Sequence, residues 1–454
     1  MSKTPYQTEI DNIINLYKNK KFIEARDHAL KITKKFPDFY YGWKALGIIL
    51  KQIGNISESL RVTKKAIRLN PKDPELYYNL ANIFLLLKKF LDSKQCYEKA
   101  IKLNPNYAEA YNNLGITLRE LENLDDSEKA LRKSIEIDQN YSDAYINLSK
   151  TLYLKKNFKS AFELSEWRWE KDYLIGKKIV SSRPIWNGQR NSKILVWKEQ
   201  GIGDEIMLFS MLAELRLVSK KIIVYCDKRL IPLLSRSFSK DIIYHSNIKN
   251  ISEDDYDTQI SVGSLLQFFR TDLNSFKISA KGYLKSDEEK TKKIKKKLKK
   301  NCDYKIIGIS WKTYSNLRMA SYRNILLKDL VDIFNKKNVK LINLQYGEVS
   351  NEINFVKKQM GIEILDLKEI DKKNDLDSLA SLISACDLVI SIDNLTVHLA
   401  GSLGISTKLL LPYNMDTRWG LERNKSFLYD SVNIYRQTKL GDWSEILQQI
   451  KSNF

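Results

Sequence analysis

The first segment that carries residue types suited to chemistry is EQGIGDEIM at 199–207. It follows a short apolar run, and Gly201 and Gly203 permit a tight turn before Asp204 at the start of a helix. A carboxylate held in this way can serve as a general base. The third glycine of a dinucleotide site and the lysine of a P-loop are both missing. The competing interpretation is a plain glycine turn in which Asp204 caps the helix.

A second loop, SIDNLTVHLAGSLG at 391–404, also follows an apolar run. That run ends at Asp393, and we expect an apolar helix to begin near Thr396. Unpaired N–H groups at a helix start attract anions, so this loop is suited to a nucleotide diphosphate. Asn394 and Asp393 are capping candidates, and the Thr396 hydroxyl can donate to a phosphate. His398 falls in the first turn, where the alternative to a ligand role is simple packing.

A third loop, SWKTYSNLRMASYR at 310–323, supplies the cations Lys312, Arg318 and Arg323. We favour Lys312 and Arg323 as partners of a diphosphate, against the alternative that they are ordinary exposed cations of a basic protein. Gln345 ends the next apolar run, where its amide can meet a nucleobase or ribose. Weaker candidates after later runs are Tyr346, Arg418 and Trp419.

Short apolar runs alternate with helical stretches around these loops, a pattern typical of parallel sheets with crossover helices. The first series of expected strands is ILVW at 194–197, KIIVYC at 221–226 and DIIYH at 241–245. The second series is KIIGISW at 305–311, VKLINLQY at 339–346, IEILDL at 362–367, DLVISID at 387–393 and STKLLLP at 406–412. Ligands of doubly wound sheets bind beyond the carboxyl ends of the strands, which is where the three loops fall. The sequence therefore predicts two Rossmann-like halves in tandem.

The N-terminal third of the chain repeats with a period of 34 residues. The large aromatic residues that keep this step are Trp43, Tyr77, Tyr111 and Tyr145, followed by Leu46, Leu80, Leu114 and Leu148. Small residues keep it at Gly47, Ala81, Gly115 and Ser149, and again at Ala25, Ser59, Ser93, Ser127 and Ala161. Pro37, Pro71 and Pro105 close the units, because proline cannot continue a helix. Five helical hairpins follow from this pattern.

These residues resemble the tetratricopeptide repeat over residues 8–173. One hairpin cannot bury its apolar face alone, so neighbours stack into a solenoid whose first helices line a groove. The resemblance implies a peptide or protein partner in that groove. The alternative is that the array only supports the domain that follows it.

The glycine loop ending in Asp204, together with the later pattern D-N-x-x-x-H-L-A-x-x-L-G, resembles the heptosyltransferase family of glycosyltransferases over about residues 190–453. The phrases WKEQGIGDEI, INLQYG, SACDLVISIDN and RQTKLGDWSEI are similar to a subgroup that joins tetratricopeptide repeats to this domain. The resemblance implies a GT-B fold. Where the family has a serine or threonine cluster before its base, this chain has Glu199 and Gln200.

Residue roles follow from the resemblance. Asp204 is expected to be the base on the acceptor hydroxyl, with Gly201 and Gly203 in the acceptor loop. The nucleotide-sugar donor is expected to be bound by Lys312, Arg323, Gln345, Asp393, Asn394, Thr396 and His398. The donor loop has no acidic pair spaced like a DxD clamp, so we expect no obligatory metal and no cofactor besides the nucleotide-sugar substrate.

The expected function is that of an enzyme, a glycosyltransferase that moves a sugar from a nucleotide-sugar to a protein, glycan or lipid acceptor. Inversion is expected, because a single displacement has one base and no covalent intermediate. The repeats would assist recognition of the acceptor or a partner, a layout similar to that of protein O-GlcNAc transferases. The alternative is a catalytically inactive tetratricopeptide scaffold whose glycosyltransferase-like domain senses a nucleotide.

The formal charge of +21 at pH 7 raises the question of nucleic-acid binding. The positive charge is spread over the whole chain, and the densest run, Lys290–Lys300, has Ile294 and Leu298 four positions apart. This spacing is typical of an exposed amphipathic helix, so we expect no nucleic-acid partner. The chain has no run of roughly 18 apolar residues and no apolar stretch near MSKTPYQTEI. We therefore expect no transmembrane segment and a cytoplasmic location.

The four cysteines, Cys96, Cys226, Cys302 and Cys386, include no CxxC pair, and the three histidines are far apart. This argues against a transition-metal site or a disulfide framework. The expected fold class is α plus α/β. Its parts are a tetratricopeptide solenoid at 1–173, a junction at 174–190, a Rossmann-like acceptor half at 191–286 and a Rossmann-like nucleotide-sugar half at 287–454.

Overall fold

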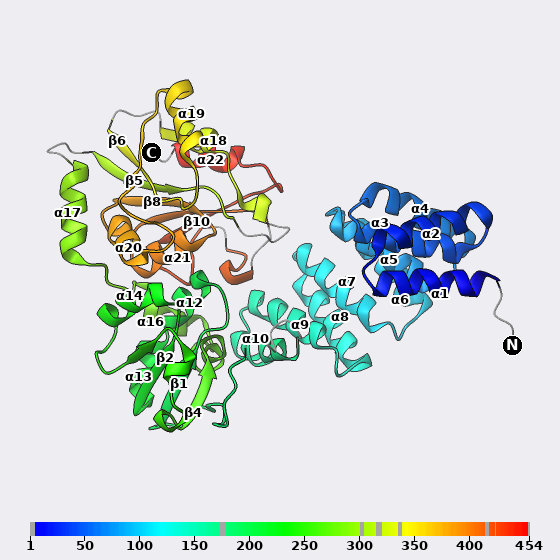
Figure 1. The fold of residues 1–454 in the computed structure, drawn as a ribbon, viewed down its shortest axis with the longest axis horizontal. Helices are drawn as coiled ribbons and strands as arrows, with labels where there is room; N and C mark the ends of the chain where they lie inside the picture. Colours follow the sequence, from blue (N-terminus) through cyan, green and yellow to red (C-terminus); the bar gives the residue numbers. More distant parts are fainter. Residues whose placement is uncertain are drawn as a thin grey trace. The chain divides into compact units, whose positions relative to one another are not determined.

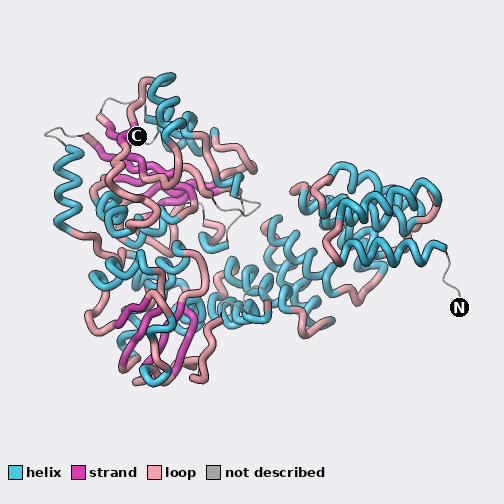
Figure 2. Tube along the Cα trace, viewed as in Figure 1, coloured by secondary structure: helices cyan, strands magenta, loops and turns pink. Residues whose placement is uncertain are grey.

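The computed structural model describes residues 5–171, 178–299, 304–314, 320–334, 338–413, 417–422 and 424–452. Cys302, Arg318 and the expected boundary at 173–174 lie outside these ranges. The chain forms two compact units, Met1–Lys155 and Lys156–Phe454 (Figure 1). Figure 2 shows helices throughout the first unit, and the strands of the described residues all belong to the second.

The first unit is a row of antiparallel helix pairs that follow the 34-residue step. Its helices are α1 (Pro5–Lys18), α2 (Phe22–Lys35), α3 (Tyr40–Gln52), α4 (Ile56–Leu69), α5 (Pro74–Leu86), α6 (Phe90–Leu103), α7 (Ala108–Glu120), α8 (Leu124–Ile137) and α9 (Ser142–Leu154). Each helix packs on the next, so the core continues from pair to pair. The expected helical solenoid is confirmed.

Small residues bring the two helices of a pair together. The serine of the second helix donates its hydroxyl to the carbonyl oxygen of the small residue of the first: Ser59 to Gly47 at 2.7 Å, Ser93 to Ala81 at 2.9 Å and Ser127 to Gly115 at 2.7 Å. A Cβ atom added at Gly115 would lie 2.5 Å from Leu131 Cγ of the facing helix. This position therefore needs a glycine for packing, even though glycine weakens a helix.

We predict that Gly115→Ala lowers the free energy of unfolding by about 1–2 kcal/mol, because the crowding of Leu131 outweighs the gain in helix propensity. Urea unfolding of the full chain, followed by far-UV circular dichroism, measures the change. Ser149→Ala is the matched control, since Ser149 holds the same repeat position and already carries a Cβ. A Gly115→Ala protein more stable than wild type would contradict the packing argument.

The first sheet of the second unit is fully parallel, with the strand order β3-β2-β1-β4. Its strands are β1 (Lys193–Trp197), β2 (Lys221–Tyr225), β3 (Ile243–His245) and β4 (Thr258–Ser261). Strand β4 was not among the expected strands. The junction segment extends this sheet, because Trp186 N donates to Gln259 O at 2.9 Å and Gln259 N donates to Pro184 O at 3.0 Å.

The second sheet is also parallel, in the order β10-β9-β8-β5-β6-β7. Its strands are β5 (Lys305–Ser310), β6 (Val339–Asn343), β7 (Ile364–Leu365), β8 (Leu388–Ile392), β9 (Thr407–Leu411) and β10 (Val432–Arg436). Five of them fall within the expected runs, and β10 was not expected. The expected α/β region with parallel sheets is therefore confirmed.

Helices cover both sheets. In the N-terminal part they are α10 (Phe158–Ser165), η1 (Glu166–Glu170), α12 (Ile202–Phe209), α13 (Leu212–Val218), η2 (Lys228–Leu230), α14 (Ile231–Ser237), η3 (Ile248–Asn250), η4 (Glu253–Asp255), η5 (Val262–Leu265), α15 (Leu266–Phe269) and α16 (Leu273–Ala280). Helix α17 (Glu288–Lys299) follows and packs on a helix of the C-terminal part. In the C-terminal part the helices are η6 (Ala320–Arg323), α18 (Leu327–Val331), η7 (Asp332–Phe334), α19 (Ser350–Met360), α20 (Leu376–Ser384), α21 (Leu395–Ser402), η8 (Thr417–Trp419) and α22 (Ser444–Ser452). Within the described ranges, no helix is long and apolar enough to cross a membrane.

The two sheets share one hydrophobic core. Ile206 of α12, Leu379 of α20 and Leu399 of α21 belong to the same buried cluster as residues of β1 and β5. The cluster runs through helices that cover both sheets and packs them into one unit. That arrangement positions the loops identified from the sequence.

Candidate functional site

Each sheet has a point at which its strand order reverses, and ligands of doubly wound sheets bind there. In the first sheet this point lies between β1 and β4, and in the second between β5 and β8. The loop after β1 carries Asp204, the loop after β5 carries Lys312, and the loop after β8 carries Asp393 and Asn394. The topology thus brings the sequence candidates to the two switch points.

The helices α12 and α21 begin side by side, one from each sheet. A Cβ atom added at Gly203 would lie 3.2 Å from His398 Cδ2 and 3.9 Å from Leu395 Cα, the first residue of α21. The glycine therefore permits a close approach of the two helix starts. The first backbone N–H groups of a helix have no carbonyl partner within the helix, so the region between the two starts favours negative charge.

Asp204 is the third residue of α12, and Gly201 occupies the N-cap position that the competing interpretation gave to Asp204. The Asp204 carboxylate accepts a hydrogen bond from Arg418 Nη1 at 2.5 Å. Its side chain is 19% exposed and that of Arg418 is 29% exposed. Asp204 is thus reachable from solvent, and its ion pair links the first sheet to the segment after β9.

Asn394 organises the start of α21. Its side-chain oxygen accepts from Thr396 N at 2.9 Å, which caps the helix, and its Nδ2 donates to Ser310 Oγ at 2.8 Å. The same amide therefore ties the end of β8 to the end of β5. Thr396 is buried in the first turn of α21.

Asp393 lies one residue before this cap and is almost completely buried. Its Oδ1 accepts from Trp419 Nε1 at 3.0 Å, and its Oδ2 lies 3.2 Å from Arg323 Nη1. His398 Nε2 is 3.9 Å from the same carboxylate. The structure thus brings Asp393, Arg323 and His398 together, with Trp419 as a further partner.

The His398 ring is buried between two aromatic side chains. It stacks on Trp419 with ring centroids 5.4 Å apart and an angle of 22°, and its Nδ1 lies 3.1 Å from the Tyr429 hydroxyl. Burial raises the pKa of Tyr429, so this hydroxyl keeps its proton at neutral pH. Tyr283 pairs with Tyr429 and donates to Ile206 O of α12 at 2.5 Å. A polar chain thus joins α21 to α12.

The side chains of Gln345 and Lys312 contact neighbouring protein groups outside α21. The Gln345 side-chain oxygen accepts from Trp311 N at 3.1 Å, Lys312 N at 3.0 Å and Ser310 Oγ at 3.0 Å, so it orders the loop after β5. The Lys312 ammonium pairs with Glu352. Burial lowers the pKa of Lys312, but the hydrogen bonds and charge interactions with Glu352 and Tyr314 together outweigh burial and leave the pKa raised. Lys312 is therefore cationic at neutral pH.

A polar cavity of about 340 Å³ opens beyond β6 and β7. Its walls include Asn343, Gln345, Asp366 and Lys372. The Asp366 carboxylate accepts from Asn343 Nδ2 at 3.0 Å and from Lys372 Nζ at 2.7 Å. Asn343 and Lys372 are buried, so the cavity has built polar walls. Of these residues the sequence reasoning named only Gln345 as a site residue; Asn343 lies in the quoted phrase INLQYG but was not singled out, and Asp366 and Lys372 fall outside the loops identified from the sequence.

Comparison with known proteins identifies the helical array. Residues 47–88 match the family described as TPR repeat, and residues 74–107 and 96–132 match families described as Tetratricopeptide repeat. The helical array therefore contains tetratricopeptide repeats over residues 47–132.

One relative is Protein FlbA of Caulobacter vibrioides (strain ATCC 19089 / CIP 103742 / CB 15), 29% identical over 283 residues. The match covers 58% of this chain and 47% of FlbA, so the chain spans about half the length of this relative.

Similar solved structures include MamA, at 23% identity over 36% of this chain and 96% of that chain, with a TM-score of 0.32. YrrB, described as a TPR protein with an unusual peptide-binding site, is 20% identical over 38% of this chain and 91% of its own, with a TM-score of 0.31. A thermophilic TPR protein of Thermus thermophilus is 15% identical over 37% of this chain and 91% of its own, with a TM-score of 0.34.

Glu205, next to Asp204, is a buried carboxyl whose oxygen accepts from Asp227 N at 3.0 Å. Burial raises the pKa of Glu205 from 4.5 to about 7. The folded protein therefore keeps a proton that the unfolded chain releases between these pH values. This contribution to stability is fully present below about pH 4.5 and is lost as the pH rises through about 7.

We predict that Glu205→Gln removes this loss, because an uncharged amide can still accept from Asp227 N. Between pH 4.5 and 8 the wild type should lose about 3 kcal/mol of stability relative to the variant. Urea unfolding across this pH range measures the difference. Glu288→Gln, at an exposed position of α17, should track the wild type. Parallel pH curves for wild type and Glu205→Gln would contradict the assignment.

Proposed function

We propose that the chain is a nucleotide-sugar-dependent glycosyltransferase of the GT-B type that transfers a sugar with inversion to a protein, glycan or lipid acceptor. The observation that carries the proposal is the meeting of α12 and α21, where Asp204 is paired with Arg418 and Asp393 is paired with Arg323. Sugar transfer needs a base for the acceptor hydroxyl and positive charge for the leaving diphosphate.

The diphosphate of the donor would bind at the start of α21. Backbone N–H groups of that helix start bind anions, and Arg323 and Arg418 lie near it. Asn394 and Gln345 would act indirectly, because their side chains order the loops that carry Thr396 and Lys312. Arg323 and Arg418 would supply the positive charge that stabilises the leaving diphosphate, without a metal ion.

The nucleoside end of the donor would extend into the cavity beyond β6 and β7. Asn343, Asp366 and Lys372 offer hydrogen-bond donors and acceptors at its wall, as a base and ribose require. The cavity lies at the carboxyl edge of the same sheet as α21, where doubly wound sheets bind nucleotides.

Asp204 would become the base when Arg418 turns to the diphosphate. The two side chains pair at 2.5 Å, and a diphosphate would compete for the guanidinium. The freed carboxylate would take the proton of the acceptor hydroxyl as its oxygen forms a bond to the anomeric carbon. The bond from that carbon to the phosphate oxygen breaks, and its electron pair leaves with the nucleoside diphosphate. One displacement of this kind inverts the anomeric centre.

The tetratricopeptide repeats fit a role in protein–protein interaction, and we propose that they recruit the acceptor or a partner. The Asp204–Arg418 ion pair also favours a second function, because the arginine occupies the carboxylate that an acceptor hydroxyl would have to reach. In that case the chain is a tetratricopeptide scaffold that senses a nucleotide without turning it over.

Nucleotide binding tests the donor site. We predict that one family of nucleoside diphosphates raises the melting temperature of the full chain, since these ligands bind the folded state only. The shift should be lost in Arg418→Gln, which removes a phosphate partner, and kept in Asp204→Asn. Arg216→Gln, which breaks an exposed ion pair with Asp241, is the control and should keep the full shift. If no nucleotide shifts the melting temperature of a well-folded sample, the proposed donor site is contradicted.

Turnover separates the enzyme from the scaffold. With the nucleotide-sugar that gives the largest thermal shift, Asp204→Asn should reduce transfer or hydrolysis by about 10²–10⁴-fold while leaving donor binding intact. Release of the nucleoside diphosphate measures the rate, and NMR of the product gives the anomeric configuration. Equal turnover by wild type and Asp204→Asn would reject Asp204 as the base, and a retained configuration would reject the single displacement.

A further inference from the structure

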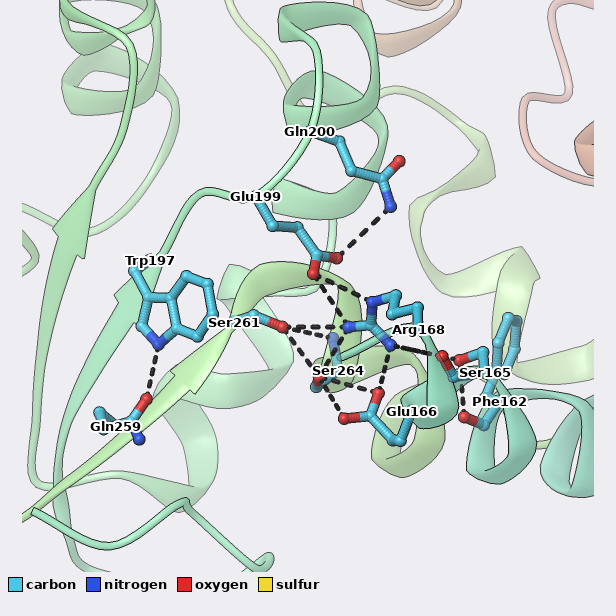
Figure 3. A network of polar contacts seen from close by, with 10 residues as sticks. All are labelled: Phe162, Ser165, Glu166, Arg168, Trp197, Glu199, Gln200, Gln259, Ser261 and Ser264. Atoms are coloured by element: carbon cyan, nitrogen blue, oxygen red, sulfur yellow. Dashed lines mark hydrogen bonds and ion pairs between the residues drawn. The ribbon is translucent and has the colours of Figure 1, made fainter. Parts of the chain in front are cut away.

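The switch point of the first sheet is occupied by the chain itself. Glu199 lies in the loop after β1, Ser261 is the last residue of β4, and Ser264 lies in η5 directly after it. Between them lies Arg168 of η1, which comes from the segment that follows α10 (Figure 3). The place where a doubly wound sheet usually binds a ligand is therefore filled by an arginine from outside the sheet.

Arg168 is at the centre of a dense polar network. Its Nε and Nη2 donate to Glu199 Oε2 at 3.1 and 3.0 Å. Nη2 also donates to Ser264 Oγ at 2.9 Å and Ser261 Oγ at 3.2 Å, and Nη1 donates to Glu166 Oε1 at 2.6 Å. Figure 3 shows these partners arranged around the guanidinium. One side chain thus joins η1 to the ends of β1 and β4.

Glu199 is a buried carboxyl with a side chain 2% exposed. Burial raises the pKa of Glu199, and Arg168 opposes this by favouring the charged form. A Cβ atom added at Gly263 would lie 1.7 Å from Glu199 Oε1, so the carboxyl is pressed against backbone that only glycine permits. The geometry fixes this carboxyl in one position.

The loop between Glu199 and Asp204 has few other side-chain anchors. Gly201 and Gly203 have no side chain, and Gln200 Nε2 reaches only the Glu199 carboxyl, at 3.5 Å. Glu199 is therefore the residue through which the start of this loop is fixed. Trp169 adds support, because its ring packs on Trp197 of β1 with centroids 5.2 Å apart.

We propose that Arg168 is a positioning residue, which holds Glu199 and through it the loop that presents Asp204. The segment after α10 then contributes to the site by fixing the loop that precedes Asp204. The consequence for turnover rests on the proposed function, but the effect on the loop does not. Glu199 and Gln200, which replace the serine or threonine cluster expected before the base, thereby gain a structural role.

Hydrogen exchange of the full chain, followed by mass spectrometry, tests the proposal. Arg168→Gln should raise exchange of the amides in peptides covering 200–207 by tenfold or more, with little change in peptides covering 395–403. Glu199→Gln is an isosteric change that removes the buried negative charge, and it should also raise amide exchange at 200–207. This second variant tests the proposal if Arg168→Gln folds poorly. Arg183→Gln is the matched control, since Arg183 pairs with exposed Asp254 at the same junction.

Unchanged exchange at 200–207 in both variants would overturn the proposal, as would a uniform rise over the whole second unit. If the wild type also turns over a nucleotide-sugar, Arg168→Gln should lower kcat with the donor KM unchanged, whereas a purely structural role would lower stability alone. A raised exchange at 200–207 without nucleotide binding by the wild type would support the positioning role and reject the proposed function.

Discussion

The close approach of two helix starts constrains the rest of the second unit. Gly203 of α12 packs on His398 of α21, so two positive helix ends face each other across the sheets. Their repulsion is offset by carboxylates, Asp204 on α12 and Asp393 before α21, and each carboxylate pairs with an arginine. In the proposed function, the same N–H groups and arginines would bind the diphosphate of the donor. The His398 ring at the start of α21 is held in turn by the Tyr429 hydroxyl.

The two sheets of the second unit differ in whether protein side chains fill the space beyond their strand ends. In the first sheet this space is filled by Arg168 and its partner Glu199. In the second sheet a polar cavity opens at the carboxyl ends of β6 and β7, on the β6 side of the switch point between β5 and β8, with Lys372 and Asp366 in its wall. Since a nucleotide needs open space with hydrogen-bond partners, this difference favours the second sheet as the donor half. The first sheet then serves to position Asp204.

Much of the fold follows from local patterns, while the site depends on distant contacts. The repeat helices were predictable because each hairpin repeats the same small residues, and most strands were continuous apolar runs. Strands β4 and β10 were missed because polar residues interrupt them; Gln259 of β4 is buried only because Trp197 Nε1 donates to it at 2.6 Å. The loops of Asp204 and Asp393 were found by type and spacing. Their partners Arg418 and Trp419 were only weak candidates, because pairing across the fold leaves no local signal.

The most direct test of the account is photoaffinity labelling of the full chain with a nucleoside diphosphate that carries a photoreactive base. The account predicts labelled peptides from 343–350 or 366–373, at the carboxyl ends of β6 and β7, and protection by excess unlabelled nucleotide. Labelling confined to 199–207 or 261–264 of the first sheet would contradict it, and so would labelling that unlabelled nucleotide does not reduce.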